Sequence, residues 1–68
     1  MTRIQDFYNG LRVAMDYDNE SIMAGLDNGD IEIPEYATVN ALADEVILFD
    51  AEEGGPTHWS AIHIRING

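Results

Sequence analysis

The N-terminal part of the chain spaces its hydrophobic residues as an amphipathic helix does. The pattern predicts a helix over residues 2–16, with Thr2 as its N-cap and Asp6 near the positive end of the helix dipole. The apolar positions that share one face of this helix are Ile4, Phe7, Leu11, Ala14 and Met15.

A polar break at 16–20 precedes a second helical pattern. The Asp and Asn residues of this break favour a helix N-cap. Asn28-Gly29 favours a helix end, because glycine readily adopts the left-handed conformation found there. We therefore expect a short helix between them that turns three apolar side chains inward. These are Ile22, Met23 and Leu26.

Two later segments alternate in the manner of β-strands. Residues 30–33 alternate acid and isoleucine before Pro34, and residues 57–66 alternate over a longer stretch. The two segments are expected to pair, because the backbone groups of a single strand need a partner. In 57–66 one face carries Ile62, Ile64 and Ile66, and the other carries Trp59, Ala61, His63 and Arg65.

Residues 35–50 return to helical spacing, with one apolar stripe that begins at Tyr36. The apolar run at 46–49 also fits a strand, and periodicity alone does not decide between the two. We prefer a helix, because the stripe continues in phase from Tyr36. Residues 51–56 are then expected to form a turn, since they contain two glycines and a proline.

These elements predict an α+β fold, in which two or three short helices pack on a small antiparallel sheet of two or three strands. The length of 68 residues fits one small domain over 1–68. A sheet this small has an exposed strand edge, through which two copies of the chain would pair as a homodimer.

Composition excludes several classes of protein. Thirteen acids face three arginines and no lysine, which gives a net charge of -10. Direct binding to nucleic acid or to an anionic membrane needs the opposite sign of charge. Cysteine is absent, and we see neither a signal peptide nor an apolar run of about 20 residues. These features favour a cytoplasmic protein.

The distribution of charge is the most informative feature. No lysine or arginine occurs between Val13 and Ile64, whereas twelve of the thirteen acids do. We expect one acidic patch from residues 16–35 and another from residues 44–53. The candidate partner-binding residues are Asp16, Asp18, Glu20, Asp27, Asp30, Glu32, Glu35, Asp44 and Glu45, together with the interface-type aromatic Trp59.

Such an excess of acid has two interpretations. Duplex DNA carries one negative charge per roughly 1.7 Å, so ten net charges match about 17 Å of duplex. A domain of this size is therefore charged about as densely as nucleic acid, and would dock in a basic groove built for phosphates. The alternative is an acidic surface that only keeps the protein soluble.

The acids and histidines do not predict a metal or catalytic site. Asp16, Asp18, Glu20 and Asp27 partly match the spacing of a calcium loop, but Ser21 stands where the loop requires glycine. The two histidines point to opposite faces of the expected strand and cannot bind one ion together. We expect neither cofactor nor enzymatic activity.

Residues 33–43 read Ile-Pro-Glu-Tyr-Ala-Thr-Val-Asn-Ala-Leu-Ala. This stretch resembles segments of the antirestriction DNA-mimic proteins carried by plasmids and transposons. The size and acidity of the whole chain are also similar to those of phage-encoded inhibitors such as anti-CRISPR proteins. The resemblance implies an anionic decoy directed at a nucleic-acid enzyme.

The leading hypothesis is therefore a non-enzymatic inhibitor from a phage or mobile element. It would bind a host protein that handles nucleic acid, such as a restriction or CRISPR complex, and occupy its phosphate-binding groove. The alternative is an interaction module that binds a partner through its C-terminal strand and Trp59, with the acids serving solubility.

Overall fold

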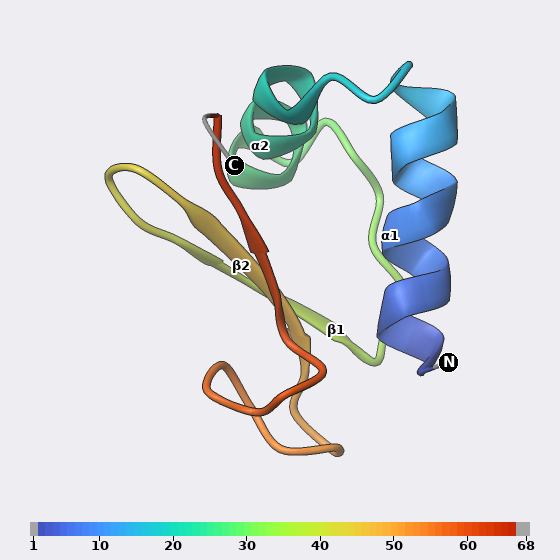
Figure 1. The fold of residues 1–68 in the computed structure, drawn as a ribbon, viewed down its shortest axis with the longest axis vertical. Helices are drawn as coiled ribbons and strands as arrows, with labels where there is room; N and C mark the ends of the chain where they lie inside the picture. Colours follow the sequence, from blue (N-terminus) through green and yellow to red (C-terminus); the bar gives the residue numbers. More distant parts are fainter. Residues whose placement is uncertain (1, 67–68) are drawn as a thin grey trace.

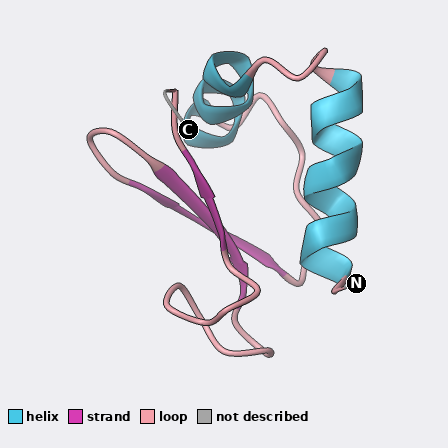
Figure 2. Ribbon diagram, in the orientation of Figure 1, coloured by secondary structure: helices cyan, strands magenta, loops and turns pink. Residues whose placement is uncertain are grey.

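The computed structural model describes residues 2–66 and has an α+β fold (Figures 1 and 2). Two helices pack on one antiparallel sheet of three strands, as predicted. The helices are α1 (Arg3–Ala14) and α2 (Asn19–Asn28), and the strands are β1 (Ala37–Ala41), β2 (Val46–Asp50) and β3 (Ile62–Ile64).

The first predicted helix is confirmed as α1, and its cap explains where it begins. The Thr2 hydroxyl accepts a hydrogen bond from the Gln5 N–H at 3.1 Å, which satisfies one of the free donors of the first turn. Ile4 is fully buried, and most of the remaining predicted stripe packs partly buried around it. Ala14 alone of that stripe is exposed.

The second predicted helix is confirmed as α2, with both of its ends where the caps indicated. The Asp18 carboxylate accepts a hydrogen bond from the Glu20 N–H at 3.2 Å, and Gly29 ends the helix with a left-handed φ of 84°. Ile22 and Leu26 are buried and Met23 packs beside them.

The predicted helix over 35–50 is wrong, because this stretch forms the hairpin β1–β2. Val39 lies opposite Leu48, and the two strands are joined by a turn in which the Leu42 N–H donates to the Glu45 carbonyl at 2.8 Å. Every residue of β2 is buried, and β2 is the central strand of the sheet. The apolar run at 46–49 therefore belongs to a strand whose residues are buried on both faces of the sheet. Its match to a helical stripe was coincidental.

The predicted strand over 30–33 is also wrong. This segment is irregular, and Ile31 turns back onto α2, where its N–H donates to the Gly25 carbonyl at 3.0 Å. The predicted partner of this segment lay in 57–66, and the strand that forms there, β3, pairs with β2 instead.

The predicted strand over 57–66 is correct only at its centre. Residues 57–61 form turns, and β3 pairs with β2 so that Val46 lies opposite Ile64. Ile64 is buried, whereas Ile66 is 61% exposed beyond the end of the sheet.

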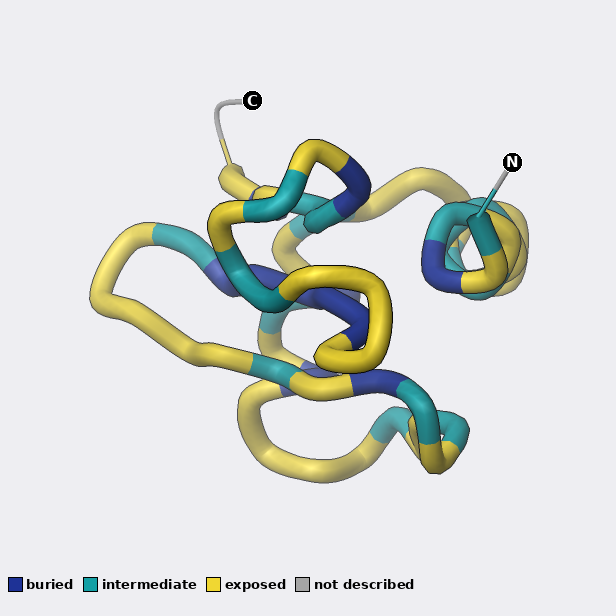
Figure 3. Tube along the Cα trace, turned by 90° about the horizontal axis from the view of Figure 1, so that it is seen from below, coloured by how far each residue is buried: buried dark blue, intermediate teal, exposed yellow. Residues whose placement is uncertain are grey.

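The two helices lie on one face of the sheet (Figure 1). Helix α1 packs against β2 and β3, and α2 packs against β1 and β2. Figure 3 shows the buried positions along β2 and, in α1, on the side of the helix that faces the sheet. The core consists of Ile4, Ile22, Leu26, Ala37, Val46, Leu48 and Ile64.

Candidate acidic interface beside helix α2

Seven exposed carboxylates belong to α2 and the segments that flank it. Asp16 and Asp18 precede the helix, Glu20 and Asp27 lie within it, and the others follow it. We call this set the α2 acidic surface. It comprises Asp16, Asp18, Glu20, Asp27, Asp30, Glu32 and Glu35, and all seven are exposed.

The helix itself holds two of these acids on its solvent side. Glu20 and Asp27 are seven residues apart, so they lie on the same face of α2 at 3.6 residues per turn. Ile22 and Leu26 occupy the opposite, buried face. The amphipathic pattern that packs α2 on the sheet thus also fixes which way its acids point.

No carboxylate of the α2 acidic surface forms an ion pair within the described residues 2–66. The arginines are engaged elsewhere: Arg3 binds Asp50 and Glu52, and Arg65 binds Glu45 with 2.8 Å between Nε and Oε2. Neither Arg3 nor Arg65 is therefore paired with an acid beside α2.

Arg12 lies at the border of the α2 acidic surface, where its guanidinium contacts two aromatic rings. Its guanidinium carbon is 5.8 Å from the ring centre of Tyr8 and 5.2 Å from that of Tyr17. This contact was not predicted from the sequence. The spacing of Tyr8 and Arg12, four residues apart on a helix, was the available signal.

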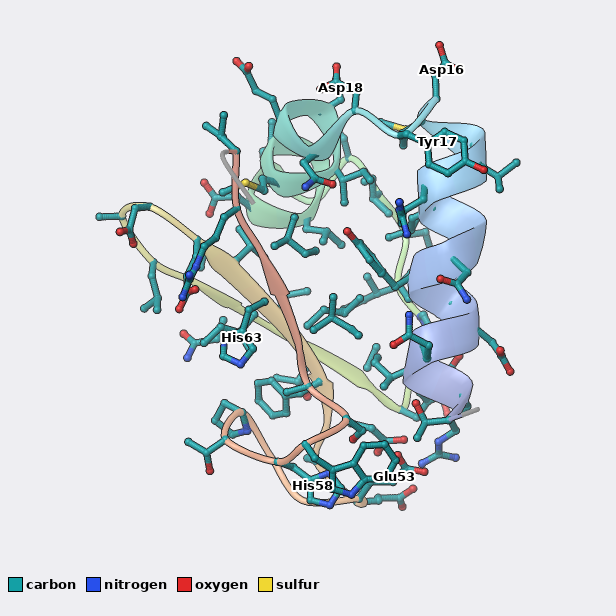
Figure 4. The ribbon with its side chains drawn as sticks, in the orientation of Figure 1. Asp16, Tyr17, Asp18, Glu53, His58 and His63 are labelled. Carbon is teal, nitrogen blue, oxygen red and sulfur yellow. The ribbon has the colours of Figure 1, made fainter. Side chains whose placement is uncertain are left out.

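The chain turns from α1 to α2 through two residues with left-handed backbone. Asp16 has a φ of 58° and Tyr17 a φ of 62°, a conformation that costs side-chain-bearing residues roughly 1–2 kcal/mol each. Figure 4 shows Asp16, Tyr17 and Asp18 together at this corner, at the opposite end of the molecule from Glu53. The turn holds Asp16 and Asp18 outward beside the exposed Tyr17 ring.

Asp18 has a structural role in addition to its charge. Its second carboxylate oxygen accepts a hydrogen bond from the Ser21 hydroxyl at 2.8 Å. This bond, with those from the Ser21 and Glu20 backbone, lowers the pKa of Asp18 below 3.8 and keeps it ionised.

The acids of 44–53 do not form the second patch that the sequence suggested. Asp44 and Glu45 precede β2 and Glu52 and Glu53 follow it, so five strand residues, about 16 Å, separate the two pairs. Three of the five acids in this stretch form ion pairs with two arginines. Asp50 and Glu52 bind Arg3, and Glu45 binds Arg65 with His63 Nδ1 at 3.6 Å.

Trp59 directly follows His58, which lies at the end of the molecule opposite the corner of Asp16 and Asp18 (Figure 4). Trp59 is 81% exposed, and its ring is tilted by 41° to that of His58 with ring centres 5.3 Å apart. The loop is held by His58, whose Nδ1 accepts the Ser60 N–H at 3.3 Å. Trp59 also lines a cavity of about 400 Å³ with Thr2, Gln5 and Ser60.

The partial calcium-loop spacing corresponds to a turn and the helix α2, so no such loop forms. Within residues 2–66, no three His, Cys, Asp or Glu side chains are grouped as a metal site would require. No helix in this described part is long and apolar enough to cross a bilayer.

Comparisons with known proteins found no relative of this chain. Neither a protein-family model, nor a curated protein, nor a solved structure matches the chain.

Proposed function

We propose that this protein inhibits a host nucleic-acid-binding protein by occupying its basic groove with the α2 acidic surface. The observation that carries the proposal is the segregation of charge. Seven exposed acids beside α2 have no ion-pair partner within residues 2–66, while Arg3 and Arg65 bind acids at the two ends of β2.

The magnitude of the charge supports a nucleic-acid mimic. The longest dimension of the protein is 26 Å, and a duplex of that length carries roughly 15 phosphates, of which roughly half face any one side. The seven carboxylates beside α2 are comparable in number. A groove that binds phosphates would gain similar attraction from this surface, with fast and salt-sensitive association.

The protein acts in this proposal by binding alone, in the cytoplasm of a host cell that a phage or mobile element has entered. Restriction and CRISPR complexes are the class of partner that we expect. They contact phosphates through basic grooves, and blocking such a groove disables them.

A matched pair of variants tests the proposal. Asp27→Asn with Glu32→Gln removes two charges from the α2 acidic surface, and Asp6→Asn with Glu53→Gln removes two exposed, unpaired charges elsewhere. Host proteins retained by the immobilised wild type should be released by duplex DNA. We expect the first variant to weaken this retention about 2–30-fold and the second to leave it nearly unchanged.

If both variants lose host-protein retention equally, only net charge matters and the proposed role of the α2 acidic surface is contradicted. Host proteins that stay bound in the presence of duplex DNA would also contradict the proposal. The first variant should fold at least as well as the wild type, because removing unpaired like charges relieves repulsion. A loss of binding therefore cannot be assigned to unfolding if its melting temperature is maintained.

The exposure of Trp59 favours one alternative function, an interaction module that binds through an aromatic anchor. A tryptophan that is 81% exposed beside a cavity has the chemistry of an interface hot spot. Binding that is insensitive to salt and lost on Trp59→Ala would favour this module over the groove-blocking inhibitor.

A further inference from the structure

The outer edge of β1 is an unpaired strand edge. The sheet order is β1-β2-β3, so β1 pairs with β2 on one side only. The Leu42 N–H points toward β2, where it donates to Glu45. Because backbone groups alternate along a strand, Asn40 and Thr38 also point toward β2, while Val39 and Ala41 point outward.

The outward groups of Val39 and Ala41 have no backbone partner within the described residues. The Ala37 N–H donates to the Pro34 carbonyl at 3.0 Å, but no such hydrogen bond reaches the amides of Val39 or Ala41. These two residues leave two N–H and two C=O groups in the arrangement that a further strand would use.

The strand also lacks the devices by which proteins protect such an edge. Its sequence, Ala-Thr-Val-Asn-Ala, contains no charge and no proline, and the last two residues are exposed. The nearest unpaired charges flank the strand. They are Glu35 before it and Asp44 after it, and both are exposed.

We propose that the open edge of β1 accepts an extended, basic segment of the partner as a fourth strand. This inference rests on the proposed function for the basic character of the partner, and it adds the mode of binding. Main-chain hydrogen bonds to Val39 and Ala41 give the strand its register, while lysines or arginines at its ends meet Glu35 and Asp44.

A second copy of the chain fits this edge poorly. In an antiparallel pair centred on Val39, Glu35 of each copy lies opposite position 43 of the other, beside Asp44. The pairing thus brings like charges together at both ends, and each copy has a net charge of -10. Charge complementarity therefore favours a basic strand over a homodimer.

A cavity at the start of β1 supplies a place for one basic side chain. It has a volume of about 420 Å³, and Glu35, Tyr36, Thr38 and Glu52 line it together with Arg3. The Arg3 guanidinium lies 4.5 Å from the ring centre of Tyr36 and pairs with Glu52, so Glu35 is the carboxylate of this cavity that has no ion pair within residues 2–66. A lysine or arginine of the incoming strand meets the Glu35 carboxylate there.

Hydrogen exchange with a synthetic peptide tests the inference. The probe carries lysines at both ends of an alternating valine–threonine stretch, and its counterpart carries glutamates in place of the lysines. We expect the basic peptide to slow exchange of the Val39 and Ala41 amides about tenfold or more. The Thr38 and Asn40 amides are already bonded to β2 and should change little. The acidic peptide should have no effect.

A proline variant provides the second measurement. Ala41→Pro removes an outward N–H that β2 does not use, so the hairpin can retain its ladder, and Ala41→Thr keeps that N–H as the control. We expect Ala41→Pro to reduce peptide affinity at least about fivefold relative to Ala41→Thr.

The outcomes separate this inference from the function on which it rests. Changes confined to residues 16–32, without the alternation at Val39 and Ala41, would overturn strand addition and leave the acidic interface intact. Protection that grows with protein concentration alone would assign the edge to a second copy and also overturn it. The proposed function fails instead if amide substitutions beside α2 leave host-protein binding unchanged.

Discussion

The guanidinium of Arg3 binds the buried carboxylate of Asp50, 47 residues away, and so joins the start of α1 to the end of β2. The same guanidinium also binds Glu52 and lies over the Tyr36 ring, whose hydroxyl donates to the Arg3 carbonyl at 3.3 Å. Asp50 in turn accepts the Glu52 N–H at 3.0 Å. One cation thus fixes the N-terminal helix to the sheet and orders the turn after β2.

Replacing Arg3 alone should destabilise the fold more than replacing Arg3 and Asp50 together. Arg3→Met leaves the Asp50 carboxylate buried without its cation, and we expect the melting temperature to fall by about 5 °C or more. Adding Asp50→Asn to that variant should recover part of the loss, which thermal unfolding followed by circular dichroism would measure. A double variant that is less stable than Arg3→Met would contradict this role.

Stability should decline at acid pH through Asp50 and Glu45. Hydrogen bonds from Arg3 lower the pKa of Asp50 below 3.8, and those from Arg65 lower the pKa of Glu45 below 4.5. A carboxyl whose pKa is lowered by folding stabilises the protein above its unfolded pKa, and this contribution is lost as the pH falls through the folded pKa. The loss should therefore begin near pH 4.5 and continue below pH 3.8.

Denaturant unfolding between pH 6 and pH 2 measures this decline, in about 0.5 M salt so that repulsion among the unpaired acids is screened. The double variant Asp50→Asn, Glu45→Gln should show a flatter dependence on pH. An equally steep decline in that variant would assign the acid sensitivity to other groups.

The two glycines within the helices should respond oppositely to alanine. A Cβ at Gly25 would approach the Ile31 side chain to 2.5 Å, so we expect Gly25→Ala to destabilise the protein by about 1–3 kcal/mol. A Cβ at Gly10 meets nothing within 4 Å, and Gly10→Ala should stabilise by about 0.5–1 kcal/mol. Urea denaturation would compare the two. A stabilised Gly25→Ala would show that Ile31 does not pack closely on α2.

Salt should stabilise the free protein. A net charge of -10 on a molecule 26 Å long repels itself, and ions screen that repulsion. We expect the melting temperature to rise by about 4–8 °C for each kcal/mol of repulsion relieved between low salt and about 0.5 M salt. The melting temperature of the Asp27→Asn, Glu32→Gln variant should rise less with salt. A melting temperature that falls with salt would mean that the arginine ion pairs outweigh the repulsion.

The parts of the fold that could be predicted are those set by local chemistry. Thr2, Asp18 and Gly29 mark helix ends through their own hydrogen bonds and backbone preferences. Glu20 and Asp27 are exposed because α2 buries its other face. β1 and β2 could not be predicted in this way, because an apolar run buried on both faces carries no period. The Arg3–Asp50 pair depends on two elements that only tertiary packing brings together.

In the proposed function, the α2 acidic surface, and not the overall charge, binds a phosphate-binding groove. The most direct measurement is displacement of labelled duplex DNA from a recovered host protein across a range of salt concentrations. The wild type should displace the DNA with an affinity that falls steeply with salt, and Asp27→Asn with Glu32→Gln should displace it more weakly than Asp6→Asn with Glu53→Gln. Equal displacement by the two variants, or by wild type at low and high salt, would contradict the account.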